Sequence, residues 1–473
     1  MWDVVSSAFA IALVIILIVV VLLIVGFAGG MLRRRRRRET SSPSGHSGRC
    51  VDRASQLLRR VMTQHTNITI VDAMGEAPST VIPPTTDNAR CRPIIVVHKC
   101  RMFNRIVQSG ELGFAESYMD GDWSTPDLEA VLTELVRNQD DILAALRQHS
   151  LSLVMMNLTA HAHALLFPTN TLETSKSNIS MHYDVGNDLY TRMLGPTMQY
   201  TCAYYHEDGM MTLDQAQLAK MRLVAKKLDL RPGMTVLDIG CGFGAMGYFL
   251  ATNYDVQVLG VTLSHEQVAY ANENYRHPRL EVRYQDYRHV DGVFDRVYSI
   301  GMFEHVGRNN YAEYYDKCYE LLKPDGVMLL HTIGTTVRDA NPLLDDNFMG
   351  KYIFPEGQLP HMSSITQSFS DRWHFEDWQN FGMSYAKTLR AWRANIGDWR
   401  GLDAKKYNER FRRMWEMYLM GCIAYFQARV IVLWQIVYTK RDPAMKPRGD
   451  AHHIRRCAPM APLRFDFGIE RSA

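Results

Sequence analysis

The ten residues Thr235-Val-Leu-Asp-Ile-Gly-Cys-Gly-Phe-Gly244 decide which fold this chain is expected to adopt. The first half is a β-branched, apolar run, which is typical of a buried strand. Three glycines follow at alternate positions, and a helical pattern begins near Met246. Glycine keeps a strand-to-helix turn tight and lets a ligand approach the backbone at the end of a sheet, where doubly wound folds bind nucleotides. The stretch therefore predicts a ligand-binding turn in an α/β domain.

The spacing of these glycines distinguishes two classes of nucleotide ligand. A dinucleotide-binding turn has the pattern GxGxxG and an acidic residue about 20 positions later for the ribose. Here the third glycine, Gly244, comes one residue early, and the next strand ends in Gly260-Val-Thr-Leu-Ser264 without a carboxylate. NAD is therefore disfavoured. The order acid-x-Gly-x-Gly-x-Gly, which starts at Asp238, is instead similar to the first motif of S-adenosylmethionine-dependent methyltransferases.

The region around this motif alternates apolar runs with helical patterns. Runs at Val256–Val261, Arg296–Ile300 and Val327–His331 predict strands, and Val430–Tyr438 predicts a closing strand. Strands that alternate with helical segments indicate a parallel, doubly wound sheet. We therefore expect an α/β chain with the Rossmann-like fold of class I S-adenosylmethionine-dependent methyltransferases, together with a small N-terminal domain and an N-terminal transmembrane helix.

The start of the chain predicts the membrane anchor. No charged residue lies between Val4 and Leu32, and about 20 apolar residues in a helix span a bilayer core of ~30 Å. A cleaved signal peptide is the alternative, but such peptides begin with a basic segment and have a shorter apolar core, whereas this chain begins Met1-Trp-Asp3. We expect a retained, single-pass span.

Six consecutive arginines, Arg33–Arg38, follow the apolar run. Positive flanks of a span stay cytosolic, so the catalytic domain is expected to face the cytosol. The same arginines are expected to bind anionic lipid head groups, and a nuclear-localisation signal is the weaker interpretation beside a span. The chain carries 53 Lys and Arg against 50 Asp and Glu, a net charge of +3. Because the arginine block exceeds that excess, the remainder is net acidic, which disfavours a nucleic-acid-binding protein.

Composition divides the 473 residues into several units. The expected boundaries are a transmembrane anchor at 4–32, a basic and polar linker at 33–50, a small N-terminal lipid-associated domain at 51–167, a linker at 168–178, a catalytic domain at 179–440 and a basic tail at 441–473. The N-terminal domain is expected to contain a short strand at Ile94–His98 and helices around Leu128–Leu146. None of the eight cysteines forms a CxxC pair, so no metal site is expected.

Several strings, taken in order, resemble the cyclopropane-fatty-acyl-phospholipid synthases, which are relatives of the mycolic-acid cyclopropane synthases. The strings are Gly113-Phe-Ala-Glu-Ser-Tyr-Met-Asp-Gly121, His182-Tyr-Asp-Val-Gly-Asn-Asp188, Gln199-Tyr-Thr-Cys-Ala-Tyr-Tyr205, Val236-Leu-Asp-Ile-Gly-Cys-Gly-Phe-Gly244, Gly301-Met-Phe-Glu-His-Val-Gly307, Leu329-Leu-His-Thr-Ile-Gly334 and Tyr352-Ile-Phe-Pro-Glu-Gly357. The resemblance extends from about Phe103 to Lys440. The anchor and the first linker lie outside it.

The resemblance implies transfer of a methylene from S-adenosylmethionine to the cis double bond of an unsaturated phospholipid acyl chain, through a carbocation. It also implies that a bound bicarbonate acts as the base. The residues that match the family's base site are Cys202, Glu304, His331, Ile333 and Tyr385. Hydroxyl and imidazole groups can donate hydrogen bonds to such an anion, and a carboxylate can orient its acidic proton.

The resemblance also assigns cofactor-binding residues. They are Tyr200, Thr201, Asp238, Gly240, Cys241, Gly242, Gly244, Thr262, Leu263, Gln267, Tyr287 and Arg288. Gln267 stands where the ribose-binding acid of a dinucleotide fold is missing, and Asp286 either joins the site or caps a loop. Phe243 replaces a frequent tryptophan, which puts substrate preference in doubt more than activity.

Three alternatives stay open at the level of sequence. A fatty-acyl methyl or methylene transferase would lack ring closure, and a small-amine N-methyltransferase would need no base aimed at the new methyl group. A membrane-tethered lipid-binding protein without catalysis would be expected to lose S-adenosylmethionine binding. The resemblance further implies a possible homodimer.

Overall fold

The computed structural model describes residues 53–73, 92–149, 185–206, 211–337, 347–355, 357–369, 371–441 and 463–468. The segment Cys50–Ala473 belongs to one compact unit. The expected anchor at 4–32, the arginine block and the predicted boundaries near residues 167 and 178 lie outside the described residues. None of the helices in the described ranges is both long enough and apolar enough to cross a bilayer.

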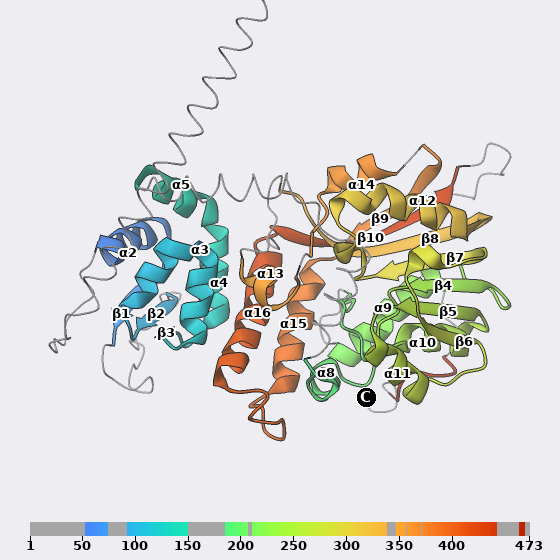
Figure 1. The fold of residues 1–473 in the computed structure, drawn as a ribbon, viewed down its shortest axis with the longest axis horizontal. Coiled ribbons are helices and arrows are strands. Elements are labelled where there is room, and N and C mark those ends of the chain that lie inside the picture. Colours follow the sequence, from blue (N-terminus) through green and yellow to red (C-terminus); the bar gives the residue numbers. More distant parts are fainter. Residues whose placement is uncertain are drawn as a thin grey trace, which may run out of the picture. The chain divides into compact units, whose positions relative to one another are not determined.

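A seven-stranded sheet with the order β6-β5-β4-β7-β8-β10-β9 forms the centre of the catalytic region (Figure 1). The strands from β6 to β8 in this order are parallel, whereas β10 is antiparallel to both β8 and β9. The strands are β4 (Thr235–Ile239), β5 (Gln257–Thr262), β6 (Leu280–Tyr284), β7 (Phe294–Ile300), β8 (Leu322–Thr335), β9 (Trp373–Asn380) and β10 (Ile431–Lys440). The predicted parallel, doubly wound arrangement is confirmed for the strands from β6 to β8, whereas the predicted closing strand β10 runs antiparallel to them.

Alternate side chains of the inner strands enter different hydrophobic cores, so both faces of the sheet are covered. In β8, Met328 belongs to a core with Tyr314 of α12 (Tyr311–Leu321), whereas Leu329 belongs to a core with Phe249 of α10 (Ala245–Tyr254). A parallel strand buried on both faces reads as a continuous apolar run. This is why the sequence pattern finds the central strands.

The two edge strands are not predicted by the sequence pattern. In β6 only Val282 is buried, because the strand lies at one edge of the sheet. At the other edge, β9 has the sequence Trp-His-Phe-Glu-Asp-Trp-Gln-Asn, in which apolar and polar residues do not form an apolar run. Edge strands are partly solvated, so they lose the signature that identifies central strands.

The described part of the catalytic region contains further helices, and α13, α15 and α16 lie on the side of the sheet that faces α3 and α4 (Figure 1). The further helices are α8 (Asn187–Leu194), α9 (Leu213–Lys227), α11 (His265–Asn274), α13 (Phe348–Tyr352), α14 (Met362–Ser368), α15 (Met383–Ile396) and α16 (Glu409–Gln427), with short 3-10 turns η2 (Tyr287–His289), η3 (Phe303–His305) and η4 (Arg308–Asn310). The long helix α16 buries Met414, Trp415 and Tyr418 on one face.

Residues 53–73 and 92–149, here called the N-terminal unit, form a small three-stranded sheet with helices. Its elements are α2 (Arg53–His65), β1 (Thr69–Asp72), β2 (Ile94–Val97), α3 (Arg101–Met119), β3 (Trp123–Ser124), α4 (Leu128–Arg137) and α5 (Gln139–His149). The predicted strand and helices of this region are therefore present. Both α3 and α4 contact α16 of the catalytic region.

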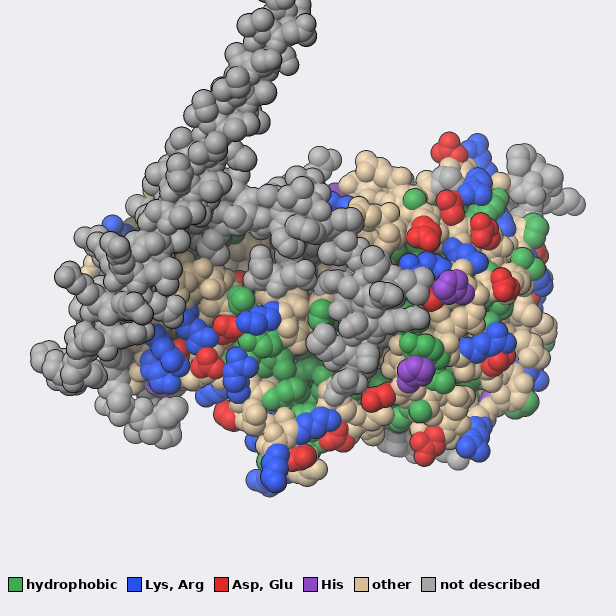
Figure 2. Space-filling view, in the orientation of Figure 1, with side chains coloured by type: hydrophobic (Ala, Val, Ile, Leu, Met, Phe, Trp, Pro, Cys, Tyr) green, Lys and Arg blue, Asp and Glu red, His purple; other side chains and the backbone are tan. Residues whose placement is uncertain are grey.

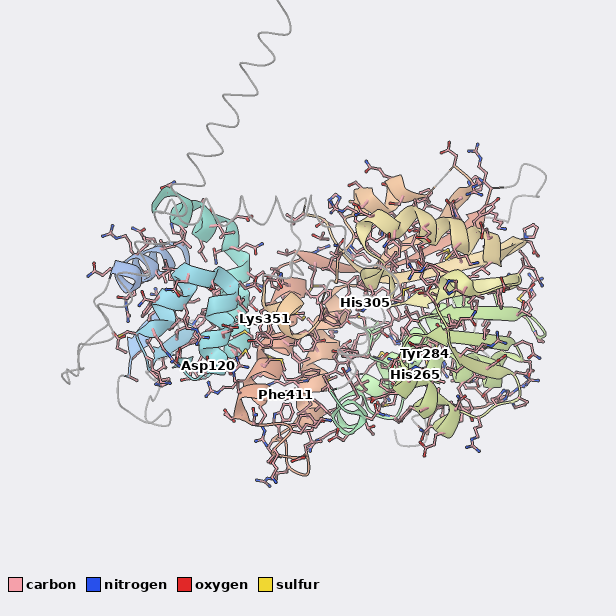
Figure 3. All side chains as sticks on the ribbon, viewed as in Figure 1. Asp120, His265, Tyr284, His305, Lys351 and Phe411 are labelled. Carbon is pink, nitrogen blue, oxygen red and sulfur yellow. The ribbon has the colours of Figure 1, made fainter. Side chains whose placement is uncertain are left out.

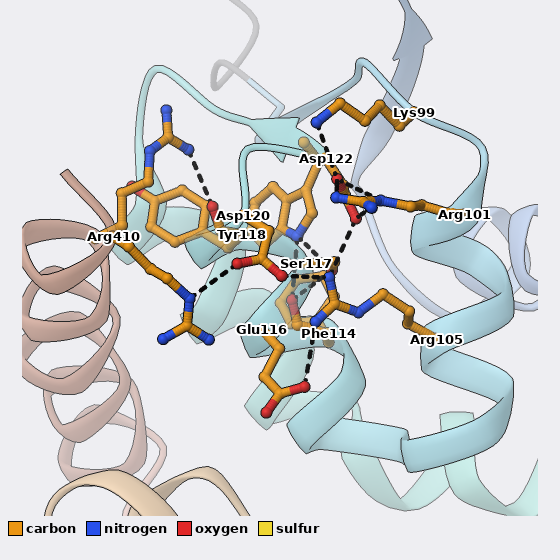
Figure 4. Close-up of polar contacts among 12 residues, drawn as sticks. Lys99, Arg101, Arg105, Phe114, Glu116, Ser117, Tyr118, Asp120, Asp122 and Arg410 are labelled. Atoms are coloured by element: carbon orange, nitrogen blue, oxygen red, sulfur yellow. Dashed lines mark hydrogen bonds and ion pairs between the residues drawn. The ribbon is translucent and has the colours of Figure 1, made fainter.

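An ion-pair network attaches the N-terminal unit to the catalytic helices (Figure 4). At its centre is Asp122, which is fully buried and accepts hydrogen bonds of 2.8 to 2.9 Å from Arg101. Arg105 donates to Asp120 at 2.7 Å and to Glu116 at 3.1 Å. From α16, Arg410 donates to Asp120 at 2.9 Å. The acidic residues of the Gly113–Gly121 string, Glu116 and Asp120, therefore serve as ion-pair partners within this network.

A second ion pair is buried inside the catalytic region. Lys227 Nζ at the end of α9 lies 3.0 Å from Asp377 Oδ2 of β9, and the side chains are 2% and 4% exposed. Two charges this far from water depend on each other, because each compensates the desolvation of the other. The pair therefore ties α9 to the edge strand β9.

We predict that Asp377→Asn lowers the free energy of unfolding by about 3–5 kcal/mol, because it leaves the Lys227 charge buried without a counter-ion. Urea denaturation followed by circular dichroism measures this loss. The double variant Lys227→Met/Asp377→Leu serves as the control, and we expect it to be more stable than the single variant. A single variant as stable as the double one would contradict the interpretation.

Candidate active site

The first cavity lies at the carboxyl ends of β4, β5 and β7 and has a volume of about 130 Å³. Its lining includes every predicted cofactor residue except one: Tyr200, Thr201, Asp238, Gly240, Cys241, Gly242, Thr262, Leu263, Gln267, Tyr287 and Arg288. The exception is Gly244, which is the N-cap of α10 with φ +87. A Cβ there would lie 2.8 Å from the Cβ of Ala271. Gly244 therefore serves helix packing and does not line the cavity.

The glycine turn itself is shaped for a close approach. Gly240 has φ +78, and a Cβ at this position would lie 2.6 Å from the Cβ of Met302. A residue with a side chain is disfavoured at such a φ, and here it would also clash. The backbone of Gly240 and Gly242 is thus exposed to the cavity with no side chain between it and a ligand.

Gln267 lies in the first turn of α11 and is 3% exposed. Its Oε1 accepts a hydrogen bond of 2.7 Å from Thr262 Oγ1. No described residue accepts a hydrogen bond from its amide nitrogen, so the amide can donate one to a ligand hydroxyl. An ionised carboxylate at this position could only accept a hydrogen bond. The geometry supports the role that the sequence predicts for this residue.

Asp238 and Tyr298 meet at the end of β4. The Tyr298 hydroxyl donates to Asp238 Oδ2 at 2.7 Å. Burial raises the pKa of Asp238 to about 7, although this hydrogen bond and the charge of Lys220 oppose the shift. The carboxyl is therefore oriented and lies in the wall of the cavity.

The buried Lys220 is a member of this site that the sequence analysis did not single out. Its Nζ donates to Gln199 Oε1 at 2.8 Å and to Thr201 Oγ1 at 2.7 Å. Burial lowers the pKa of Lys220 to about 7. Its position on α9 could have revealed this role from sequence, because Lys220 lies one turn from the buried Gln217 and Val224. A lysine on the buried face of a helix needs a polar partner.

Asp286 both caps η2 and lines the first cavity. Its carboxylate accepts from the Arg288 backbone at 2.9 Å and from the Arg288 guanidinium at 2.9 and 2.8 Å. Burial raises its pKa, but the hydrogen bonds from Arg288 outweigh burial and the pKa is lowered. Both interpretations of Asp286 therefore hold, and its carboxylate fixes Arg288 at the cavity.

Glu304 and His331 form a second polar group deeper in the fold. Ile333 N donates to Glu304 Oε1 at 2.7 Å, whereas Glu304 Oε2 has no hydrogen-bond partner in the described part of the chain. Gln435 Nε2 donates to His331 Nδ1 at 3.1 Å, which places the imidazole proton on Nε2. His331 Nε2 also lacks a partner among the described residues. One acceptor and one donor are therefore left for a small polar ligand.

The protonation of this pair follows from its burial. Burial raises the pKa of Glu304 to about 7. For His331, burial and the charges of Lys220 and Lys227 lower the pKa, so the imidazole is neutral at physiological pH. Next to Glu304 on η3, His305 lines the first cavity, and burial lowers its pKa to about 4 (Figure 3).

Cys202 and Tyr385 complete the predicted base site. Cys202 is fully buried, and burial raises the pKa of its thiol. The ring of Tyr385, on α15, stacks on Phe426 with centroids 4.5 Å apart. Burial raises the pKa of Tyr385, and Cys202 and Glu304 lie close enough to Tyr385 to add to the shift. The structure thus brings the predicted catalytic side chains into one neighbourhood.

A second, larger cavity of about 370 Å³ adjoins this neighbourhood. Ile333 and Tyr385 line it, and most of the other lining side chains are aliphatic or aromatic. Its walls come from the N-terminal unit on one side and from α13, α15 and α16 on the other. Tyr200 of the first cavity and Tyr418 of the second are hydrogen-bonded through their hydroxyls at 2.8 Å. The two cavities therefore meet at this tyrosine pair.

We predict that Glu304→Gln stabilises the ligand-free protein at pH 8. The folded protein keeps the Glu304 proton up to pH ~7, whereas the unfolded chain releases it near pH 4.5, so the wild type loses roughly 3 kcal/mol of unfolding free energy as pH rises through this interval. Glu304→Gln does not lose this unfolding free energy, because glutamine does not ionise. Urea denaturation at pH 5 and pH 8 measures it, with exposed Glu320→Gln as control. Identical pH profiles for wild type and Glu304→Gln would contradict the assignment.

Comparison with known proteins places this geometry in a family. Residues 170–436 match the family model described as mycolic acid cyclopropane synthetase. The chain is 42% identical over 339 residues to the cyclopropane-fatty-acyl-phospholipid synthase of Escherichia coli, which covers 72% of this chain and 85% of that protein. It is 37% identical to a probable fatty acid methyltransferase of Pseudomonas putida, over 59% of this chain and 72% of that one.

Solved structures agree with this assignment. The cyclopropane synthase MmaA2 from Mycobacterium tuberculosis superimposes with a TM-score of 0.52 and 31% identity, covering 56% of this chain and 98% of that one. The mycolic acid cyclopropane synthase CmaA1, solved in complex with SAH and CTAB, gives a TM-score of 0.52 and 33% identity over the same shares. The chain belongs to the mycolic acid cyclopropane synthetase family and has the class I S-adenosylmethionine-dependent methyltransferase fold.

Proposed function

We propose that this chain is a cyclopropane-fatty-acyl-phospholipid synthase, which adds a methylene from S-adenosylmethionine across the cis double bond of an unsaturated phospholipid acyl chain. One observation carries the proposal. A buried acceptor and a buried donor, Glu304 Oε2 and His331 Nε2, are left without described partners beside an apolar cavity of about 370 Å³. A buried polar atom without a partner is costly, so this pair favours a bound anion next to an apolar substrate.

S-adenosylmethionine fits the first cavity. The bare backbone of Gly240 and Gly242 suits close contact with the ligand, and the Gln267 amide can bind a ribose hydroxyl. When bound, the cofactor supplies the methyl group that the alkene accepts. Tyr200 lines this cavity and is hydrogen-bonded to Tyr418 of the second one, so it would orient the transferred group toward the acyl chain, and Thr201 lines the first cavity beside it.

The apolar cavity supplies what a weak nucleophile and a cationic intermediate require. An alkene must be held close to the methyl donor, and water must be kept out because it would quench the carbocation. Aromatic rings surround the junction of the two cavities: Tyr200 and Trp392 have centroids 5.3 Å apart, and Tyr385 lies 6.1 Å from Trp392. Their faces can stabilise the positive charge.

Bicarbonate fits the polar pair. His331 Nε2–H can donate to one oxygen of the anion, and ionised Glu304 can accept its acidic proton, which increases the basicity of the remaining oxygens. The anion would take one proton from the newly added carbon, and the electrons of that C–H bond would close the ring. Cys202 and the Tyr385 hydroxyl are the further donors expected at this site.

The location of the enzyme is part of the same proposal. We infer a single-pass anchor at residues 4–32, a catalytic region facing the cytosol, contact of Arg33–Arg38 with anionic head groups, and a homodimer. A surface feature supports membrane contact: hydrophobic side chains gather over α15 and α16 on one face, with charged side chains around them (Figure 2). Such patches on a surface mark interaction sites.

The test of the reaction uses methyl-deuterated S-adenosylmethionine and vesicles of cis-monounsaturated phospholipid. Mass spectrometry is expected to show an acyl chain heavier by one methylene that has lost one of the three deuterium atoms, with no new alkene. A product that keeps all three deuterium atoms would indicate methyl branching and overturn the base assignment. Labelling of a small amine in place of lipid would overturn the substrate assignment.

We predict that turnover depends on bicarbonate and on Glu304. In carbon-dioxide-free buffer, lipid conversion by the wild type is expected to fall and to recover when bicarbonate is added. Glu304→Gln is expected to lower turnover at least 100-fold with or without bicarbonate, because a neutral amide cannot accept the acidic proton of the anion. Its affinity for S-adenosylmethionine, measured by calorimetry, should stay within about twofold of wild type, since Glu304 does not line the first cavity. Unchanged turnover would contradict the role.

A further inference from the structure

The apolar cavity is shared between the two parts of the described chain. At one end Tyr385 and Ile333 border the polar pair, and at the other the wall comes from α2, α3, α4 and α5 of the N-terminal unit. The family match begins at residue 170, so this second wall lies outside the matched segment.

Glu111 is the one charged side chain among the described residues that line this cavity. It follows Gly110, whose φ of 54° and ψ of −128° interrupt α3 and divide it into two helical segments. Residues with a Cβ rarely adopt this φ, so the glycine permits the break. Glu111 therefore begins the second segment at a fixed break in the helix, in the wall of the cavity.

The carboxyl group of Glu111 has no hydrogen bond or ion pair with any described residue. Glu111 lies close to α16. Its negative charge raises the pKa of Tyr425, and it adds to the effect of burial in raising the pKa of Cys422. Glu111 is accessible through the open cavity, yet protein surrounds it closely enough that burial raises its own pKa to about 7. A protonated carboxyl can donate one hydrogen bond, and no described residue accepts one from Glu111, so this donor is available to a ligand in the cavity.

Cys422 connects Glu111 to the reactive end of the cavity. Cys422 lies near both Glu111 and Tyr385, and all three residues line the same cavity. An acyl chain along this line would put its double bond beside Tyr385. Along such a chain the ester carbonyl is the one hydrogen-bond acceptor, and placing the terminal methyl at Glu111 would leave the carboxyl unpaired.

We propose that Glu111 binds the ester carbonyl of the acyl chain and so sets how many methylene groups separate the ester from the double bond that reaches the base site. This assignment rests on the proposed function. It makes Glu111 a specificity-determining residue, supplied by the N-terminal unit, that selects substrates by the position of their double bond.

The test compares phosphatidylcholine vesicles whose acyl chains have equal length and a cis double bond at one of three positions. The readout is the ratio of kcat/KM between the best and the worst positional isomer. Glu111→Met is expected to reduce this ratio about fivefold to tenfold, because the lost hydrogen bond no longer fixes the chain. Glu111→Gln, which keeps a donor of the same shape, is expected to retain the ratio within about twofold.

Glu320→Met, at an exposed position of α12 that lines neither cavity, is the matched control and should keep the wild-type ratio. Binding of S-adenosylmethionine by each variant shows that it is folded. The proposal is overturned if the wild type converts all isomers equally, if Glu111→Met keeps the wild-type ratio, or if it loses the same factor on every isomer. Wild-type protein that converts no isomer would instead overturn the proposed function itself.

Discussion

The hydrogen bond from the Ile333 amide to Glu304 is the contact on which the active site depends. It is 2.7 Å long and joins η3, which follows β7, to the neighbouring strand β8. Because Oε1 is held in this way, Oε2 is the carboxylate oxygen that is left buried without a hydrogen-bond partner among the described residues. The same strand holds His331, whose Nδ1 is occupied by Gln435 of β10. Two adjacent strands thus fix one acceptor and one donor within the fold.

Burial sets the chemistry of these groups. Asp238, Lys220 and Glu304 all have a pKa shifted to about 7, and in each case removal from water is the main cause. The fold is destabilised by such groups, and Lys220 recovers part of the cost through Gln199 and Thr201. Glu304 Oε2 has no described protein partner to offset the cost of its burial, so we expect a bound ligand to supply the missing hydrogen bond.

Sequence patterns are most informative where the backbone is buried on both faces. The strand before Gly240 is predicted closely, and the central part of β8 at Val327–His331 is predicted although that strand is longer at both ends, because these apolar runs come from a parallel sheet covered by helices. The edge strand β9 lacks such a run, and its partner contact with Lys227 joins residues far apart in the chain. The same limit applies to Lys220. Its place in the helical pattern indicates that the lysine is buried, but the pattern does not reveal that oxygens of Gln199 and Thr201 accept its hydrogen bonds.

The family resemblance, the glycine turn and the residue types of both the cofactor site and the base site follow from the order and spacing of residues along the chain. Three features appear only in the folded protein: Gly244 serves helix packing, Glu304 and His331 each keep one polar atom without a described partner, and Glu111 lines the same cavity as Tyr385. The physical reason is that burial and hydrogen-bond satisfaction are properties of the three-dimensional surroundings, which bring together residues hundreds of positions apart.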